Sequence, residues 1–211
     1  MSETKIKICG LSREQDIEYV NEALPDFIGF VFAKSRRQVR TETAAELKNK
    51  LDGRIKSTGV FVNEDMSSIC TLCSSGVIDY IQLHGDESSK YIETLKELLD
   101  KANCSRPIIK ALRVKDSSSL AARQELNPDY LLLDTYSHKE YGGTGEVFNW
   151  NLVQNISKPF FLAGGLKYEN VADAVRLVRP FCLDVSSGVE TDGFKDRNKI
   201  IKLVDLIRSV K

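Results

Sequence analysis

The sequence has no long hydrophobic run and no excess of charge of either sign. No apolar stretch approaches the roughly 18 residues that span a bilayer. The first residues, Met1 to Lys5, lack the apolar segment of a secretory signal. We therefore expect a cytoplasmic protein with no membrane partner. Lys plus Arg and Asp plus Glu each number 30, so no positive excess predicts binding to nucleic acid.

The sequence also lacks the features of a disulfide framework or a metal site. Its five cysteines are an odd number scattered along the chain, which favours free thiols in a reducing compartment. Cys70 and Cys73 form a C-x-x-C, but zinc needs two more ligands at suitable spacing, and no second pair accompanies them. No Ser/His/Asp triad, H-E-x-x-H or dinucleotide fingerprint occurs. We therefore expect no metal and no cofactor.

Short apolar runs alternate with helical patterns along the whole chain. Eight runs rich in Ile, Val, Phe or Leu are bounded by turn residues and predict strands over 6–8, 27–32, 58–62, 79–83, 108–112, 130–133, 160–163 and 182–185. Helical spacing predicts helices over 13–24, 43–51, 65–73, 88–99, 117–126, 151–156, 170–178 and 200–210. Several of these begin at Ser, Thr, Asp or Asn, which cap helix N-termini.

This alternation predicts an α/β fold with parallel strands and crossover helices. Eight units of roughly 26 residues nearly exhaust the chain, as a (β/α)8 TIM barrel requires. We therefore expect residues 1–211 to form a single barrel domain. A doubly wound open sheet is the rival architecture, but it would carry its glycine-rich turn after the first strand, where this chain has only Cys9-Gly10-Leu11.

The last two predicted strands both end in turns of small residues. Gly164-Gly165 follows the seventh strand, and Ser187-Gly188 follows the eighth. Glycine lets a backbone N–H approach an oxyanion, and a following helix N-terminus adds positive charge. A barrel of this kind frequently binds phosphate with the loops after strands 7 and 8. We expect these four residues to hold a small phosphorylated substrate.

Two reactive side chains close predicted strands, where a barrel places its active site. Cys9 closes the first strand; a lone cysteine is more often a small buried hydrophobic residue, but cationic neighbours and helix N-termini favour a thiolate. Asp134 closes the sixth strand, where a carboxyl is costly unless it is paired or faces the site, although it could also cap the next loop. We favour a functional role for both, with Asp134 as a proton donor.

Other polar residues follow predicted strands with less certain roles. One guanidinium of Arg36 and Arg37 could bind a substrate carboxylate while the other faces water. His84 could be a general base or a hydrogen-bonded residue at the rim, and the sequence favours neither. His138 lies in a polar segment and is expected to be exposed. The glycine-rich stretch 142–145 is a weak signal, because no Lys-Ser/Thr follows it as in a nucleotide P-loop.

Together these motifs resemble the phosphoribosylanthranilate isomerases of tryptophan biosynthesis. They run through almost the whole chain in the family's order: Lys5-Ile6-Lys7-Ile8-Cys9-Gly10-Leu11, Gly29-Phe30-Val31-Phe32 with Ser35-Arg36-Arg37, Gly59-Val60-Phe61-Val62-Asn63, Gln82-Leu83-His84-Gly85, Leu133-Asp134-Thr135 with Gly142-Gly143-Thr144-Gly145, Ala163-Gly164-Gly165-Leu166, and Asp184-Val185-Ser186-Ser187-Gly188-Val189-Glu190. The first and last of these stretches are highly specific.

The resemblance implies an Amadori rearrangement of N-(5-phosphoribosyl)anthranilate, an aminoaldose, to the 1-deoxyribulose 5-phosphate ketose. It gives the role of general base to Cys9 and that of general acid to Asp134. It places the anthranilate carboxylate on Arg37, with the neighbouring Arg36 as the alternative. We also expect His84 to contact the substrate.

Two other functions stay open at the level of sequence. Another phosphosugar barrel, such as a metal-dependent epimerase or an indole-glycerol-phosphate synthase, would share the phosphate turns. A silent phosphate-ligand binder would bind the product analogue without converting the substrate. For the isomerase we also expect Asp184 to bind the phosphosugar substrate, and the chain to be a monomer or a weak homodimer.

Overall fold

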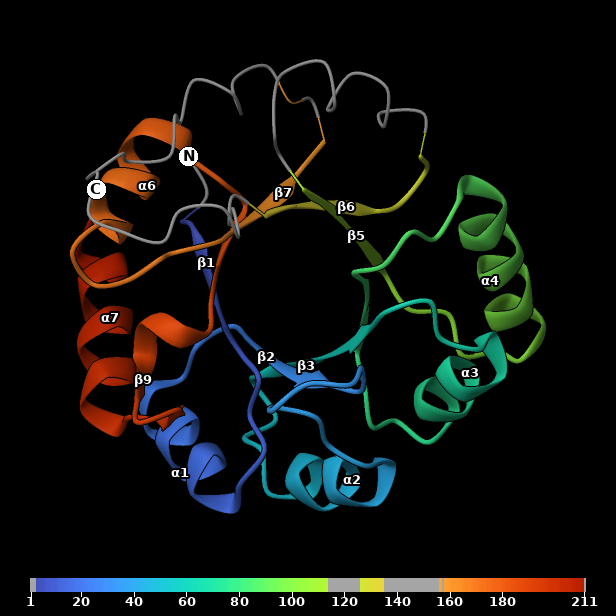
Figure 1. Cartoon of the computed structure of the whole chain (residues 1–211), viewed down its shortest axis with the longest axis horizontal. Coiled ribbons are helices and arrows are strands. Elements are labelled where there is room, and N and C mark those ends of the chain that lie inside the picture. Colours follow the sequence, from blue (N-terminus) through green and yellow to red (C-terminus); the bar gives the residue numbers. More distant parts are fainter. Residues whose placement is uncertain (1–2, 114–125, 135–155, 157, 211) are drawn as a thin grey trace.

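The eight predicted strands form one closed barrel of parallel strands in chain order (Figure 1). A computed structural model describes residues 3–113, 126–134, 156 and 158–210. Its strands are β1 (Lys5–Cys9), β2 (Phe27–Val31), β3 (Lys56–Phe61), β4 (Tyr80–Leu83), β5 (Ile108–Arg113), β6 (Tyr130–Asp134), β7 (Phe160–Ala163) and β8 (Cys182–Val185). Because β8 pairs with β1, the ring has no free edge, which confirms the predicted TIM barrel and excludes an open sheet.

Helices surround the ring of strands on its outer side (Figure 1). The described ones are α1 (Glu14–Ala23), α2 (Thr41–Asn49), α3 (Met66–Ser74), α4 (Ser89–Lys101), α6 (Val171–Val178) and α7 (Arg197–Ser209). The helices predicted over 117–126 and 151–156 lie, except for their last residues, outside the described part of the chain. No helix among the described residues is both long and apolar enough to cross a membrane.

Side-chain caps explain where several helices begin. Asp65 and Ser88 accept hydrogen bonds from the first turns of α3 and α4, at the predicted starts. Helix α7 begins three residues before the predicted start of 200, because Asp196 accepts from the backbone N–H of Lys199 at 3.0 Å. The sequence patterns did not reveal the short 3-10 turn η2 (Ser187–Val189) or the hairpin of β9 (Glu190–Thr191) and β10 (Phe194–Lys195).

Alternation along the strands separates two faces of the barrel. Successive side chains of a strand point to opposite faces. On β1, Ile6 and Ile8 belong to the core that the helices cover, together with Ile17 of α1. Lys7 and Cys9 therefore face the inside of the barrel. The same alternation turns polar residues of β4, β6 and β8 inward.

Aromatic side chains fill the inside of the barrel near the N-terminal ends of the strands. Rings lie in contact across the barrel, with centroid distances of 5.1 Å between Phe27 and Tyr80, 5.7 Å between Tyr130 and Phe161, and 4.9 Å between Tyr130 and Phe181. This layer closes the lower end of the barrel. Among the described residues, the inward-facing charged side chains Lys7 and Asp184 lie above this layer, toward the C-terminal mouth.

Candidate active site

The predicted catalytic residues lie at the same end of the barrel. Cys9 is the last residue of β1, Asp134 is the last residue of β6, and His84 directly follows β4. All strands run parallel, so these three positions share the C-terminal mouth. Nε2 of His84 lies 3.3 Å from Oδ2 of Asp134, and both side chains are about one quarter exposed, at 26% and 22%. Both are therefore reachable from the mouth.

Cys9 lies against β2 in a site that leaves little room around its sulfur. The residue opposite it is Gly29, where a Cβ would come within 2.6 Å of the sulfur. Burial raises the pKa of the Cys9 thiol, and the opposing charges of Lys7 and Lys195 do not outweigh it. The sequence argument that cationic neighbours would favour the thiolate was therefore wrong in its net direction. The cations are present, but desolvation is the larger effect.

A fully buried lysine lies one layer below Cys9. Nζ of Lys7 is 2.7 Å from Oδ2 of Asp184 on β8 and 2.7 Å from Oε1 of Gln82 on β4. Burial lowers the pKa of Lys7, but the carboxylate of Asp184 outweighs it and holds the pKa above its ordinary value. Oδ1 of Asp184 is buried and has no hydrogen-bond partner among the described residues.

The loop that carries His84 is fixed by a second buried ion pair. Glu87 lies 2.6 Å from Nζ of Lys110 and accepts hydrogen bonds from the backbone N–H groups of Asn63 and Gly85. Lys110 also donates to the carbonyl of Gly85 at 2.6 Å. A Cβ on Gly85 would lie only 2.5 Å from Oδ1 of Asn63, so the loop packs this closely only with glycine there. His84 is thus held at the mouth on a rigid support.

Both arginines of the β2 loop contact one carboxylate. Arg37 makes a bidentate pair with Glu190, with distances of 2.7 Å from Nε to Oε1 and 2.9 Å from its terminal nitrogen to Oε2. Arg36 donates to Oε2 at 2.6 Å, and Lys195 donates to Oε1 at 2.8 Å. Burial alone would raise the pKa of Glu190, but hydrogen bonds from Arg37 and Lys195 outweigh it and lower the pKa to about 2.

The two arginines differ in where their side chains lie. Arg37 passes over Gly10, where a Cβ would come within 2.4 Å of its Cδ, and its side chain is 24% exposed. Arg36 lies against Gly193 of the β9–β10 hairpin and is 56% exposed. Arg37 therefore lies beside the end of β1, next to Cys9, and Arg36 lies toward solvent. This arrangement matches the expectation that one guanidinium points inward and the other faces water.

The two predicted phosphate turns meet at the mouth. Gly164 and Gly165 have φ angles of 94° and 61°, values that L side chains rarely adopt. A Cβ on Gly188 would lie 2.0 Å from the carbonyl oxygen of Leu166, so the turn after β8 can pack against the turn after β7 only with glycine there. Ser187 lies in the same η2 turn. The fold thus brings the four predicted phosphate-binding residues together.

Several residues of the site were not assigned a role from the sequence. Lys7 and Gln82 lie in the resembling motifs, and a lysine within an apolar strand is itself a signal that could have been used. Glu190 ends the most specific motif. Lys195 has no sequence signal, because only the hairpin after β8 brings it to Glu190. His138 and the stretch 142–145 lie outside the described residues.

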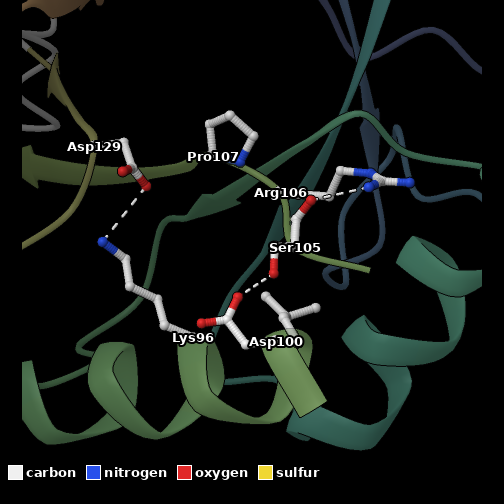
Figure 2. A pocket seen from close by; sticks show the side chains of 7 residues that line it. Lys96, Asp100, Ser105, Arg106, Pro107 and Asp129 are labelled. Carbon is white, nitrogen blue, oxygen red and sulfur yellow. Dashed lines mark hydrogen bonds and ion pairs between the residues drawn. The ribbon is translucent and has the colours of Figure 1, made fainter. Parts of the chain in front are cut away.

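A separate hollow of about 300 Å³ lies at the opposite end of the barrel (Figure 2). Pro107 and Asp129 directly precede β5 and β6, which places it at the N-terminal ends of the strands. Its charged groups already have partners: Lys96 pairs with Asp129 at 3.6 Å, and Asp100 accepts from Ser105 (Figure 2). The hollow is therefore distinct from the mouth that holds Cys9 and Asp134.

The parallel barrel with reactive side chains and paired glycine turns at its C-terminal mouth is typical of (β/α)8-barrel enzymes that act on small phosphorylated substrates. The sequence model of one such family, described as N-(5'phosphoribosyl)anthranilate (PRA) isomerase, matches residues 6–206. The chain belongs to this family. The predicted resemblance and the predicted activity, an isomerase of tryptophan biosynthesis, are thereby confirmed.

Relatives agree over nearly the full length. The N-(5'-phosphoribosyl)anthranilate isomerase of Endomicrobium trichonymphae is 50% identical over 206 residues, which cover 98% of this chain and 99% of the relative. The crystal structure of phosphoribosyl anthranilate isomerase from Thermotoga maritima superposes with a TM-score of 0.85 at 33% identity, over 97% of this chain and 98% of the other.

Two further solved structures bear on ligand and assembly. A phosphoribosyl anthranilate isomerase in complex with reduced 1-(o-carboxyphenylamino)-1-deoxyribulose 5-phosphate has a TM-score of 0.82 and 31% identity, over 97% of this chain and 98% of the other. Monomers generated from the dimeric Thermotoga maritima enzyme have a TM-score of 0.78 and 29% identity, over 98% and 99%. The first describes a relative with a reduced phosphosugar analogue bound, and the second describes a relative as dimeric.

Proposed function

We propose that Asp134 and Cys9 divide the acid and base chemistry by which this isomerase converts N-(5'-phosphoribosyl)anthranilate to 1-(o-carboxyphenylamino)-1-deoxyribulose 5-phosphate. The observation that carries the proposal is the placement of both side chains at the mouth that also carries the predicted phosphate turns. Both roles are of a kind that positioned side chains supply in general acid–base catalysis.

The reaction proceeds in two proton transfers. Asp134 gives its proton to the ring oxygen of the sugar while the bond between C1 and that oxygen breaks, and the nitrogen lone pair forms the iminium. Cys9, as thiolate, then takes the proton from C2, and the electrons of the C–H bond form the enamine, which tautomerises to the ketose. Because burial raises the pKa of the Cys9 thiol, its deprotonation is a part of the catalytic requirement.

The substrate phosphate binds the two turns after β7 and β8. Backbone N–H groups of Gly164, Gly165, Ser187 and Gly188 supply donors at a place remote from the reacting carbons, so binding energy there holds the sugar in position. Asp184 on β8 faces the inside of the barrel, and its largely buried side chain, paired with Lys7, lies at the base of the sugar site. His84 contacts the substrate at the mouth beside Asp134.

The anthranilate carboxylate binds the guanidinium of Arg37. This guanidinium makes a bidentate pair with the carboxylate of Glu190, which has the same charge and geometry as the substrate group. Arg37 lies next to Cys9, whereas Arg36 is largely exposed. Of the two alternatives, the packing therefore favours Arg37.

Lysine substitutions distinguish the two arginines. Arg37→Lys is expected to raise KM for the substrate by about 10- to 100-fold, because lysine keeps the charge and loses the bidentate fork. Arg36→Lys is the matched control and should change KM far less. Steady-state kinetics of both variants measure the difference. A larger rise in KM for Arg36→Lys than for Arg37→Lys would reverse the assignment.

The remaining predictions concern the domain, the assembly and the location of the protein. The barrel strands run from Lys5 to Val185, which supports a single domain over residues 1–211. We propose that the chain is a monomer or a weak homodimer. Its five cysteines are all free, which supports a reducing, cytoplasmic location.

Loss of substrate fluorescence with the purified chain tests the function directly. We expect turnover that a chelator does not reduce, because the proposed acid and base are side chains. Activity that is lost with a chelator would favour a metal-dependent epimerase. Binding of the product analogue by calorimetry without turnover would favour a silent binder instead.

A further inference from the structure

A continuous chain of hydrogen-bonded side chains crosses the barrel below the mouth. It runs from Nζ of Lys7 to Oε1 of Gln82 at 2.7 Å, from Nε2 of Gln82 to Nδ1 of His84 at 2.9 Å, and from Nε2 of His84 to Oδ2 of Asp134 at 3.3 Å. Three strands and the residue after one of them contribute to it: Lys7 from β1, Gln82 and the following His84 from β4, and Asp134 from β6. Lys7 and Gln82 do not face the mouth, since they are 0% and 2% exposed.

The chemistry of each group determines which partner donates and which accepts in every one of these hydrogen bonds. An ammonium group can only donate, so the atom of Gln82 that faces Lys7 must be the amide oxygen. The amide nitrogen then faces His84, and because it can only donate, Nδ1 of His84 must accept and carries no proton. The ring proton is therefore on Nε2, where it donates to Asp134.

The direction of donation along these hydrogen bonds cannot be reversed without breaking one of them. If the amide of Gln82 turned over, its NH2 group would face the ammonium of Lys7, and two donors would meet in a buried site. Lys7 is itself held in place by its 2.7 Å ion pair with Asp184. The buried cation thus sets the orientation of Gln82, and Gln82 sets the tautomer of His84.

We propose that Lys7 and Gln82 are positioning residues that keep His84 neutral and aim its Nε2–H at Oδ2 of Asp134. The inference rests on the proposed role of Asp134 as general acid and adds to it. An imidazolium at this position would hold Asp134 as a carboxylate, because a cation favours a neighbouring anion. A neutral imidazole lets Asp134 carry the proton that it must donate.

The neutral histidine also gives the two carboxyl oxygens of Asp134 different roles. Oδ2 accepts the N–H of His84 and is the carbonyl oxygen of the protonated acid, so the transferable proton is on Oδ1. When Asp134 transfers that proton to the ring oxygen of the sugar, it becomes a carboxylate, and the N–H of His84 is already in place to stabilise the new charge. No proton has to move along the hydrogen-bonded side chains from Lys7 to Asp134 for the new charge to be stabilised.

Nitrogen NMR of the unmodified protein tests the tautomer. The chain has two histidines, and the signal that is lost in the His84→Asn variant identifies His84. We expect the ¹⁵N shifts of a neutral ring protonated on Nε2 and unprotonated on Nδ1 at neutral pH. A ring protonated on Nδ1, or on both nitrogens, would overturn the proposal. This measurement does not depend on how any variant of Gln82 folds.

The variant Gln82→Glu tests whether the hydrogen-bonded side chains from Lys7 to Asp134 contribute to catalysis. A carboxylate at this position accepts from Lys7 and also from Nδ1–H of His84, so it favours the imidazolium and the ionised Asp134. We expect kcat to fall by about 10- to 100-fold with little change in KM, and the NMR signal to become that of a doubly protonated ring. Gln15→Glu makes the same chemical change on the exposed face of α1 and should leave kcat as in the unmodified protein.

The outcomes separate this inference from the general-acid assignment. If Gln82→Glu retains the kcat of the unmodified protein while Asp134→Asn is inactive, Lys7 and Gln82 have no positioning role and Asp134 remains the general acid. If Gln82→Glu loses activity while His84 keeps its neutral tautomer, the loss comes from another cause, and the proposal fails. If Asp134→Asn is fully active, the proposed function of Asp134 fails instead.

Discussion

Asp134→Asn is expected to lower kcat by about 10²- to 10⁴-fold, the range that a positioned general acid contributes. The amide has nearly the shape of the carboxyl group but cannot give a proton to the sugar ring oxygen. Its oxygen can still accept the N–H of His84, so the hydrogen bond at 3.3 Å is retained and the fold should be unaffected. Single-turnover kinetics at saturating substrate measure the effect on the chemical step.

Asp205→Asn is a suitable control for this change. Asp205 is exposed on α7, and the same substitution there alters the net charge equally. Its kcat should equal that of the unmodified protein. Near-normal turnover of Asp134→Asn would refute the role of Asp134 as general acid, because the ring oxygen would then receive its proton from another source.

Cys9→Ser is expected to lower kcat/KM by about 10²- to 10⁴-fold. A serine hydroxyl loses its proton far less readily than a thiol, so very little of the basic form is present. Serine is smaller than cysteine and fits beside Gly29, so the barrel should fold normally. Cys70→Ser, a change on α3 away from the mouth, should leave kcat/KM unchanged. Unaltered turnover of Cys9→Ser would exclude Cys9 as the base.

The pH profile of the unmodified protein adds a second measurement of the same role. Burial raises the pKa of Cys9, and the negative charge of Asp184 raises it further. The positive charges of Lys7 and Lys195 lower the pKa but do not outweigh these effects. The thiolate is therefore the minor form near neutral pH, and its fraction grows as pH increases. We expect kcat/KM to keep rising above pH ~8.5, the ordinary value for a thiol. A profile that is flat from neutral pH upward would mean that thiolate formation is not required.

The architecture could be predicted because it depends on short-range patterns. Apolar runs bounded by turn residues marked all eight strands, and regular alternation with helices implied a parallel sheet. The ends of those strands then placed Cys9, His84 and Asp134 on one face without any knowledge of contacts. Boundaries were less certain where a cap such as Asp196 extended a helix beyond its apolar pattern.

The contacts inside the site could not be predicted in the same way. Glu190 and Arg37 are separated by 153 positions, and their pairing depends on the packing of the β2 loop against the turn after β8. The raised pKa of Cys9 likewise depends on how deeply the sulfur is buried, which composition does not reveal. The sequence argument expected cationic neighbours without identifying Lys7 or Lys195, and their effect on the pKa of Cys9 is smaller than that of burial.

The amino-acid pattern was thus sufficient for the barrel and for the position of Cys9, His84 and Asp134 at its C-terminal mouth. Folding alone determined which of them touch, above all the chain from Lys7 through Gln82 and His84 to Asp134. The physical reason is that strand and helix propensities act over a few residues, whereas closure of the barrel joins side chains from strands that are distant in sequence.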